Sequence, residues 1–348
     1  YFTKFAAIVN KLFEYKTYVS KIVRILVLCI IMFSCAHRHS KESDDYEETN
    51  SSPITLTLNI ILKPTFRTLE QNSPQITNIS KRYRKRFHIE VCQNNTIITR
   101  QTIFLDSLSS TNDSLFLSTK LELNTLKYDL SVWMDYTEDD SDLHYISENL
   151  NNITCIEPYC GNTTSKECLY GHKTIDLREY RNQENIHAET NITICPPVAR
   201  YEIITTDVEE FIKQTSWHSD KKYRISFTYL FFYPMVFDAY EGIVKDSWSN
   251  VSFELPLNIT DNKQKECKLG FDYILADTTI NTAMLVLTVK DENNKEIITT
   301  SPINIPYKQG YSTRIMGNFL TKRKPGGIEI NTEFDDEINI DIDNILTY

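Results

Sequence analysis

The sequence Tyr128-Asp-Leu-Ser-Val-Trp-Met-Asp-Tyr136 is the clearest indication of the fold class of this chain. Large apolar side chains recur at every second position, and a period of two is typical of a β-strand that buries one face. One face would carry Leu130, Val132 and Met134, and the other Ser131, Trp133 and Asp135. We therefore predict a strand over residues 128–136 whose apolar face belongs to a β core.

The same alternation recurs along most of the chain. Further strands are expected at residues 54–60, 87–91, 96–104, 199–205, 223–232, 251–257, 269–275, 283–290, 296–305, 311–320 and 337–342. One helix is expected at residues 206–214, where Thr206-Asp207-Val208-Glu209 has the spacing of a capping box. Many short strands without strand–helix alternation indicate a mainly β fold of two tandem antiparallel β-sandwiches, and they oppose an α/β enzyme fold.

Two consecutive prolines, Pro196 and Pro197, mark the expected domain boundary, because proline stops regular structure and stiffens a hinge. The predicted N-terminal β-sandwich domain covers residues 54–195, and the C-terminal one covers residues 198–348. Residues 137–173 are too many for a plain turn. We expect this connection to be a structured loop or an excursion packed on the sheet.

The N-terminal region predicts export and a lipid anchor. Residues 25–33 form an apolar run behind Lys21 and Arg24, which is the layout of a signal peptide and is too short to span a bilayer. Met32-Phe33-Ser34-Cys35 resembles the lipobox of bacterial lipoproteins. Residues 1–34 are therefore expected to be a signal peptide with extra upstream residues, and Cys35 is expected to be acylated. The alternative is an ordinary signal peptide with a chance cysteine near its end.

Residues 35–53 are predicted to be a lipidated acidic tether. They are polar throughout, and such a segment cannot bury enough surface to offset the entropy of ordering it. The acidic residues Asp44, Asp45, Glu47 and Glu48 are similar to the export signal of Bacteroidetes lipoproteins. This similarity indicates a lipid-anchored protein on the exposed side of the outer membrane. A solvated charge run that no receptor reads is the alternative.

The formal net charge of −10 argues against nucleic-acid and anionic-lipid partners. One segment of this acidic chain is strongly basic, namely Lys81-Arg-Tyr-Arg-Lys-Arg86. In a strand, Arg82, Arg84 and Arg86 would share a face suited to anionic glycans or lipopolysaccharide. Two other interpretations stay open: an edge strand whose charges prevent unwanted pairing, and a protease-sensitive site.

Three cysteines, Cys155, Cys160 and Cys168, lie close enough in sequence for a local disulfide in an exported chain. Buried free thiols are the alternative. His172 could complete a Cys/His metal set, but the spacing matches no familiar zinc pattern, so no metal is expected.

Motifs of catalysis and of cofactor binding are missing from the sequence. It contains no Gly-rich phosphate loop, no His-Glu-x-x-His and no Gly-x-Ser-x-Gly. The acidic runs at 138–142 and 335–337 lack the glycine and the terminal glutamate of a calcium loop. We therefore expect no cofactor, no catalytic residues and no enzymatic activity.

An ordered series of short motifs accompanies the strand at 128–136. The series comprises Asn149-Leu150, Tyr159-Cys160-Gly161-Asn162, Leu169-Tyr170-Gly171, Ile175-Asp176-Leu177, Ala199-Arg200-Tyr201-Glu202, Phe232-Tyr233-Pro234, Leu269-Gly270-Phe271-Asp272-Tyr273, Gly317-Asn318-Phe319-Leu320-Thr321 and Pro325-Gly326-Gly327-Ile328. Together they resemble an uncharacterised Bacteroidales lipoprotein family related to fimbrillin-type fimbrial anchor and accessory proteins. The resemblance implies two transthyretin-like β-sandwiches behind a lipid anchor. It also implies relatives that polymerise when a strand of one subunit fills a groove in the next.

The resemblance favours a fimbrial anchor-like or accessory subunit that acts in cell-surface assembly or adhesion with pilin-like protein subunits. Its strand-exchange residues would be Ile338, Ile340 and Ile342, although this strand could instead complete the molecule's own sandwich. The alternative function is a stand-alone lipoprotein that binds glycans or a host surface. Phe231-Phe232-Tyr233-Pro234 is expected to belong to the core rather than to a binding platform.

Overall fold

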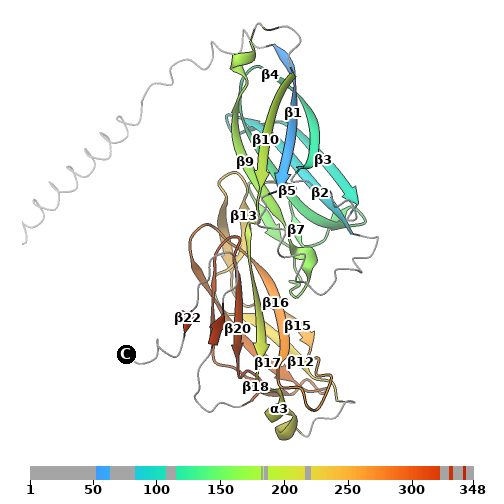
Figure 1. The fold of residues 1–348 in the computed structure, drawn as a ribbon, viewed down its shortest axis with the longest axis vertical. Helices are drawn as coiled ribbons and strands as arrows, with labels where there is room; N and C mark the ends of the chain where they lie inside the picture. Colours follow the sequence, from blue (N-terminus) through green and yellow to red (C-terminus); the bar gives the residue numbers. More distant parts are fainter. Residues whose placement is uncertain are drawn as a thin grey trace, which may run out of the picture. The chain divides into compact units, whose positions relative to one another are not determined.

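The computed structural model describes residues 52–62, 83–106, 115–181, 183, 187–215, 221–321, 329–331 and 340–341. The chain from Ser52 onward forms one compact unit, which is built almost entirely of strands (Figure 1). The strands are β1 (Pro53–Leu62), β2 (Tyr83–Gln93), β3 (Thr96–Asp106), β4 (Leu115–Asn124), β5 (Lys127–Glu138), β6 (Ser141–Asp142), β7 (Tyr145–Ile146), β8 (Ile153–Cys155), β9 (Leu169–Asp176), β10 (His187–Ile194), β11 (Val198–Thr205), β12 (Arg224–Tyr229), β13 (Tyr233–Asp238), β14 (Ile243–Trp248), β15 (Val251–Pro256), β16 (Cys267–Leu275), β17 (Asn281–Lys290), β18 (Glu296–Thr299), β19 (Ile303–Tyr307), β20 (Ser312–Gly317), β21 (Glu329–Asn331) and β22 (Ile340–Asp341). The described helices are the 3-10 helices η3 (Thr164–Lys166) and η4 (Arg178–Tyr180) and the α-helix α3 (Val208–Thr215).

Two sheets share a hydrophobic core in the N-terminal half of this unit. One sheet has the strand order β10–β1–β4, and the other has the order β3–β2–β5–β6 with β9 also paired to β5. Every second side chain of β1 is buried from Ile54 to Ile60, because a pleated strand points alternate side chains to opposite faces. These side chains join Phe87 and Leu130 of the other sheet in one hydrophobic cluster. The mainly β fold predicted from the alternation is confirmed.

Strand β5 is buried on both faces. Leu130 belongs to the cluster of the N-terminal half, whereas Trp133 belongs to a second cluster that extends into the C-terminal half. The Trp133 ring packs edge to face on Tyr145 at 5.5 Å and lies 6.1 Å from the ring of Phe237. The predicted strand and its division into two faces are confirmed, and both faces serve as core.

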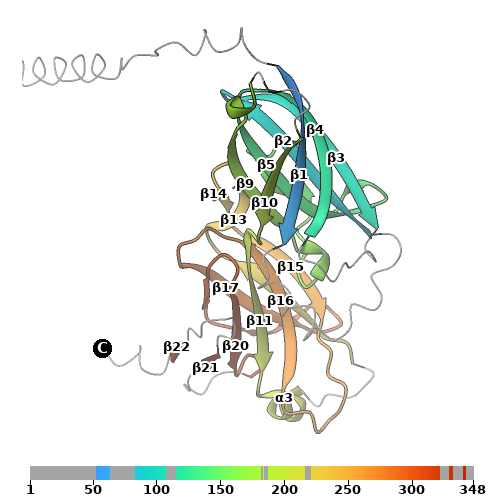
Figure 2. The same ribbon diagram turned by 45° about the horizontal axis from the view of Figure 1, so that its top comes forward.

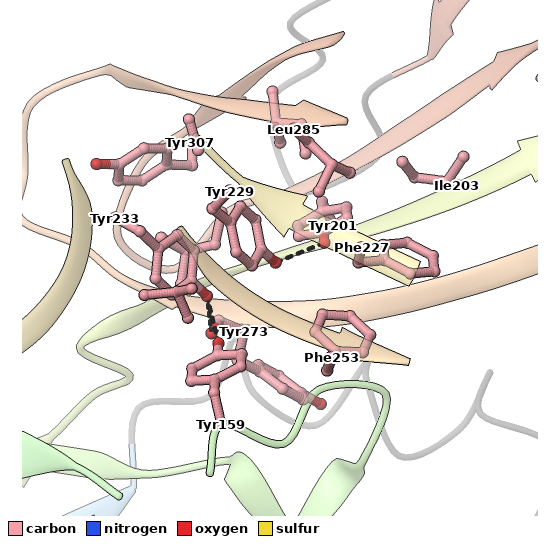
Figure 3. Close-up of a cluster of buried hydrophobic side chains, with 14 of the residues drawn as sticks. Tyr159, Tyr201, Ile203, Phe227, Tyr229, Tyr233, Phe253, Tyr273, Leu285 and Tyr307 are labelled. Carbon is pink, nitrogen blue, oxygen red and sulfur yellow. Dashed lines mark hydrogen bonds between the residues drawn. The ribbon is translucent and has the colours of Figure 1, made fainter. Parts of the chain in front are cut away.

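The second cluster fills the C-terminal half, between a sheet of order β16–β11–β20–β21–β22 and a sheet of order β15–β12–β17–β18 with β19 paired to β17. Aromatic side chains are numerous in this core. Tyr201 of β11 and Tyr229 of β12 are joined by a 2.6 Å hydrogen bond between their hydroxyl groups (Figure 3). A polar bond inside the core keeps both hydroxyls satisfied.

A small sheet of order β14–β13–β8–β7 combines strands from both sides of Pro196 and Pro197. The connection at 137–173, predicted to be a structured loop or an excursion packed on the sheet, supplies β7 and β8. It is therefore structured, and part of it forms strands of this small sheet. A side chain of β5 also contacts the part of the chain that follows Pro196 and Pro197, because Ser131 Oγ donates a 3.0 Å hydrogen bond to the carbonyl of Ala239. The division into separate domains at 195–198 and their transthyretin-like topology stay predictions.

Several strands differ from the predicted ones. The segment at 296–305 splits into β18 and β19 around Pro302, which has no N–H to donate. The segment at 223–232 ends at Tyr229, and β13, which was not predicted, begins at Tyr233. Two pairs, β1 with β10 and β11 with β20, are parallel rather than antiparallel, because their partners return after long connections rather than through hairpins.

Candidate functional site

The C-terminal strands form one edge of the sheet β16–β11–β20–β21–β22 (Figure 2). Strand β20 runs parallel to β11, β21 pairs antiparallel with β20, and β22 pairs antiparallel with β21. A strand at the edge of a sheet presents unpaired N–H and C=O groups, which can pair with another chain. This edge is therefore the candidate site for strand addition.

Four isoleucines hold matching register positions across this edge. Ile203 pairs with Ile315, and both side chains are fully buried. Ile315 in turn pairs with Ile330 of β21, and Ile330 pairs with Ile340 of β22. A strand register is strongly specified where one face is buried, because a slip of one residue would send every side chain to the opposite face. The buried position of Ile315 thus sets the register in which an outer strand can add.

Of the three predicted strand-exchange residues, the structure places Ile340, in β22. Ile338 and Ile342 lie outside the described residues. Strand exchange by this segment stays a prediction.

An exposed aromatic pair lies between β12 and β13. Phe231 is 57% exposed and Phe232 is 81% exposed, and Phe232 has a positive φ of 51°. A bulky residue in this left-handed region costs about 1–3 kcal/mol. The expectation that both rings belong to the core is wrong, because the chain leaves one sheet here and enters another, and the rings at the crossing face solvent. Tyr233 and Pro234, the next two residues, are buried as expected.

Ile280 lies at the same end of the sheet as this aromatic pair. It is exposed and directly precedes β17, whose Leu285 pairs antiparallel with Tyr229 at the end of β12. The only signal in the sequence is the pair of consecutive phenylalanines between two strands. It does not reveal the positive φ of Phe232, which comes from the fold.

Arg86 is an interior residue and not part of an exposed basic face. Its guanidinium binds Asp135 through hydrogen bonds of 2.9 and 2.7 Å, and it reaches Asp142 at 2.5 Å and Ser147 Oγ at 2.7 Å. Burial raises the pKa of Asp135, although the hydrogen bonds and charge of Arg86 oppose that shift. The arginine therefore neutralises the buried Asp135 and also binds Asp142, which is exposed. The sequence missed these partners because they lie 49 or more residues away.

Arg84 lies nearer the surface on the same strand. It pairs with Asp140 at 2.8 Å and lies over the ring of Phe104. Strand β2 runs between β3 and β5, so the interpretation as an edge strand is wrong. Arg82 lies outside the described residues, and an anionic-ligand role for Arg82 and Arg84 stays a prediction.

Cys155, Cys160 and Cys168 are free thiols in the structure. Cys155 and Cys168 are buried, and burial raises the pKa of Cys155 to about 12 and that of Cys168 as well. A thiol held protonated in this way is a poor nucleophile and a poor metal ligand. The local bridge expected among these cysteines stays a prediction, and no metal-binding group of His, Cys, Asp and Glu occurs within the described residues.

The predicted anchor and export residues lie outside the described part of the chain. They are Cys35, Asp44, Asp45, Glu47 and Glu48. Within the part that is described, no helix combines the length and the apolar character needed to cross a bilayer. Lipidation and surface export stay predictions.

These features define a mainly β protein with an aromatic-rich core and a sheet whose described strands end in β21 and β22. Residues 47–346 match a family of unknown function, DUF6562. The chain belongs to this family, which confirms the resemblance to an uncharacterised family that the ordered motifs indicated. No curated protein matches the sequence.

Solved structures that align with this one include the fimbrial anchor protein Mfa2 from Porphyromonas gingivalis. It is 11% identical with a TM-score of 0.42, and the alignment covers 83% of this chain and 99% of that one. Another is a fimbrial assembly protein from Parabacteroides distasonis, which is 12% identical with a TM-score of 0.37, over 84% of this chain and 97% of that one.

Proposed function

We propose that this protein is a non-enzymatic surface lipoprotein that serves as a fimbrial anchor-like or accessory subunit in cell-surface assembly or adhesion. The observation that supports this most directly is the C-terminal edge, where Ile330 and Ile340 continue the register of the buried Ile315. A strand that adds to such an edge gains affinity from main-chain hydrogen bonds and specificity from alternate side chains.

Among the described residues, the outer strands pair at few positions. Strand β21 pairs there with β20 at three register positions and β22 pairs with β21 at two, whereas β20 pairs with β11 at six. Short ladders with few hydrogen bonds open at low free-energy cost. A strand of a pilin-like subunit can therefore replace β21 and β22 on β20, or these strands can leave to pair with that subunit.

The anchoring part of the proposal rests on Cys35, which would carry the lipid that holds the chain in the outer membrane. A single fatty acyl chain gives only marginal membrane binding, and several chains on one modified cysteine hold far better. The acidic tether would then place the compact unit outside the cell.

The test uses the full chain in intact cell envelopes and a reagent that joins carboxylates to amines. Glu329 and Asp341 supply carboxylates at the edge. Sequenced crosslinks should join residues 329–341 to a second polypeptide. The variant Ile330→Asp should lose them, because it places a charge in register with buried Ile315. Asn331→Asp adds the same charge at the neighbouring position and should keep them. Wild-type envelopes without such crosslinks, or an Ile330→Asp variant that retains them, would refute the proposal.

A second candidate function is supported by the exposed Phe231 and Phe232. Large apolar side chains on a strained turn mark contact surfaces, and aromatic rings stack on sugar rings. A stand-alone lipoprotein that binds glycans or a host surface would use this pair.

A further inference from the structure

A lysine and an aspartate are in contact inside the aromatic core. Lys166 ends η3 and is 2% exposed, and Asp272 lies in the middle of β16 and is fully buried. Lys166 Nζ donates a 2.8 Å hydrogen bond to Asp272 Oδ1. The two residues are 106 positions apart and come from opposite sides of Pro196 and Pro197. This pair is the most deeply buried ion pair among the described residues.

Three tyrosine hydroxyls converge on the other oxygen of the carboxyl group. Asp272 Oδ2 accepts hydrogen bonds of 2.6 Å from Tyr159, 2.8 Å from Tyr229 and 3.2 Å from Tyr233. Figure 3 shows these tyrosines around one point of the core, where the Tyr159 and Tyr233 hydroxyls are themselves hydrogen-bonded. Three donors on one oxygen withdraw electron density from the carboxyl carbon, as donors do at a developing oxyanion.

Tyr159 also connects the amine to this oxygen. Its hydroxyl accepts a hydrogen bond from Lys166 Nζ while it donates to Asp272 Oδ2. Burial, followed by the charge of Asp272, raises the pKa of Tyr159, so the hydroxyl stays protonated. It is thus placed to pass a proton from the nitrogen to the oxygen.

The surroundings of Lys166 and Asp272 make it unfavourable in free energy to keep both groups charged. Tyr159, Tyr229, Tyr233 and Phe253 exclude water from the pair, and removing two charges from water costs several kcal/mol per ion. Condensation to an amide would abolish both charges and release one water. Amine and carboxyl groups held together in a dry site react as an intramolecular pair with a high effective concentration.

We propose that Lys166 and Asp272 form an intramolecular isopeptide bond. Lys166 first gives one proton to the carboxyl group, and the neutral nitrogen then attacks Asp272 Cγ. The C–N bond forms and the Cγ–Oδ2 bond breaks. Oδ2 leaves as water, having taken two protons in all from the nitrogen, each of them relayed through the Tyr159 hydroxyl, which contacts both Nζ and Oδ2. Oδ1 stays as the amide oxygen, bonded to the Tyr273 N–H, which lies 2.8 Å from it. No oxidant or cofactor takes part.

The measurement is the mass of the purified full chain. Wild-type protein should be lighter by about 18 Da, the mass of one water, than its own unreacted form. This loss is read against Lys166→Met, which lacks the amine and should show none. Lys268→Met is the matched control, because Lys268 also contacts an acid, Glu202 at 3.1 Å, but near the surface. It should keep the loss.

Proteolysis then locates the bond. A branched peptide containing both Lys166 and Asp272 should appear in digests of the wild type and of Lys268→Met. Tyr159→Phe keeps the ring beneath Lys166 but removes the hydroxyl, so freshly made protein should contain an unreacted fraction. A wild type without the mass loss would establish a plain ion pair and overturn the proposal. A loss that persists in Lys166→Met, or a branched peptide at other residues, would overturn it equally.

Discussion

The hydroxyl of Tyr240 donates a 2.5 Å hydrogen bond to Oε2 of Glu90, a residue 150 positions earlier in the chain. Glu90 is fully buried in β2, and its other oxygen pairs with Arg100 at 3.0 Å. Tyr240 follows β13, so this bond fastens the C-terminal half to the sheet of the N-terminal half. A buried carboxylate needs its partners, because it has no water to replace them.

Replacement of Tyr240 by phenylalanine should therefore lower the free energy of unfolding by about 1–3 kcal/mol, the cost of leaving a buried acceptor short of a donor. Urea unfolding monitored by tryptophan fluorescence measures this change. Tyr311→Phe is the control, because its ring lies under Lys308 and phenylalanine keeps that contact. Equal effects of both substitutions would show that the Tyr240–Glu90 bond adds no stability.

Arg86→Met should be among the most destabilising single changes in the N-terminal half. It leaves Asp135 buried without its cation, a loss of about 3–5 kcal/mol. Arg84→Met, two residues away on the same strand, breaks the half-exposed pair with Asp140 and the contact with the Phe104 ring, and should cost less than about 2 kcal/mol. The midpoints of urea unfolding compare the two. If Arg86→Met costs no more than Arg84→Met, the buried network does not stabilise the fold.

Stability should fall as the pH drops below 6.5, because two histidines are held neutral in the folded chain. Burial, followed by the charges of Arg86 and Arg100, lowers the pKa of His88 to about 3, and burial together with Lys166 lowers the pKa of His144 to about 3. The unfolded state binds these protons from pH 6.5 downward and the folded state does not. Each histidine therefore removes about 1.4 kcal/mol per pH unit between pH 6.5 and 3.

The check is urea unfolding of wild type and His88→Gln at pH 7.5, 6, 5 and 4.5. The free energy of unfolding of the variant should fall less steeply with decreasing pH, by about 1.4 kcal/mol per pH unit, which is the contribution of one histidine. His187→Gln removes an exposed histidine and should follow the wild type. A His88→Gln slope that matches the wild type would contradict the assignment.

Phe232→Gly should separate stability from surface binding. Glycine adopts the positive φ of 51° without strain, so the folded state should gain up to about 1 kcal/mol, less the entropy that glycine adds to the unfolded chain. If the aromatic pair binds glycans or a host surface, the same variant should retain the fold and lose retention on immobilised glycans. Ile146→Ser, which removes an exposed apolar side chain elsewhere, is the control. Unchanged retention in Phe232→Gly would remove the support for the second candidate function.

The strands that the sequence predicts well are those whose alternation is local. The faces of β5 follow from residue order alone, since a pleat imposes them. The same pattern cannot tell whether the second face meets water or protein. Trp133 is covered by Tyr145 and Phe237, and the latter comes from a strand that the sequence did not predict.

The polar contacts inside the protein could not be predicted from the sequence, because they join residues that are far apart along the chain. Arg86 stands in a basic run that suggests a surface, and its partners Asp135 and Asp142 become visible only when β2 and β5 pair. Asp272 carried a signal, because it interrupts the apolar strand between Phe271 and Tyr273. Its partner Lys166 lies in a loop without periodicity, so no local pattern links the two.

Strand β1 gives the molecule a mechanical property. It lies between β4 and β10, and it pairs with β10 without interruption from Thr55 to Leu62. The chain enters β1 at Pro53, so tension that acts along the axis of β1 from this end pulls the strand lengthwise. Its ladder hydrogen bonds on both sides then bear the load together and must break together. The end of the compact unit nearest the predicted tether is therefore built to resist force by shear rather than to unzip one bond at a time.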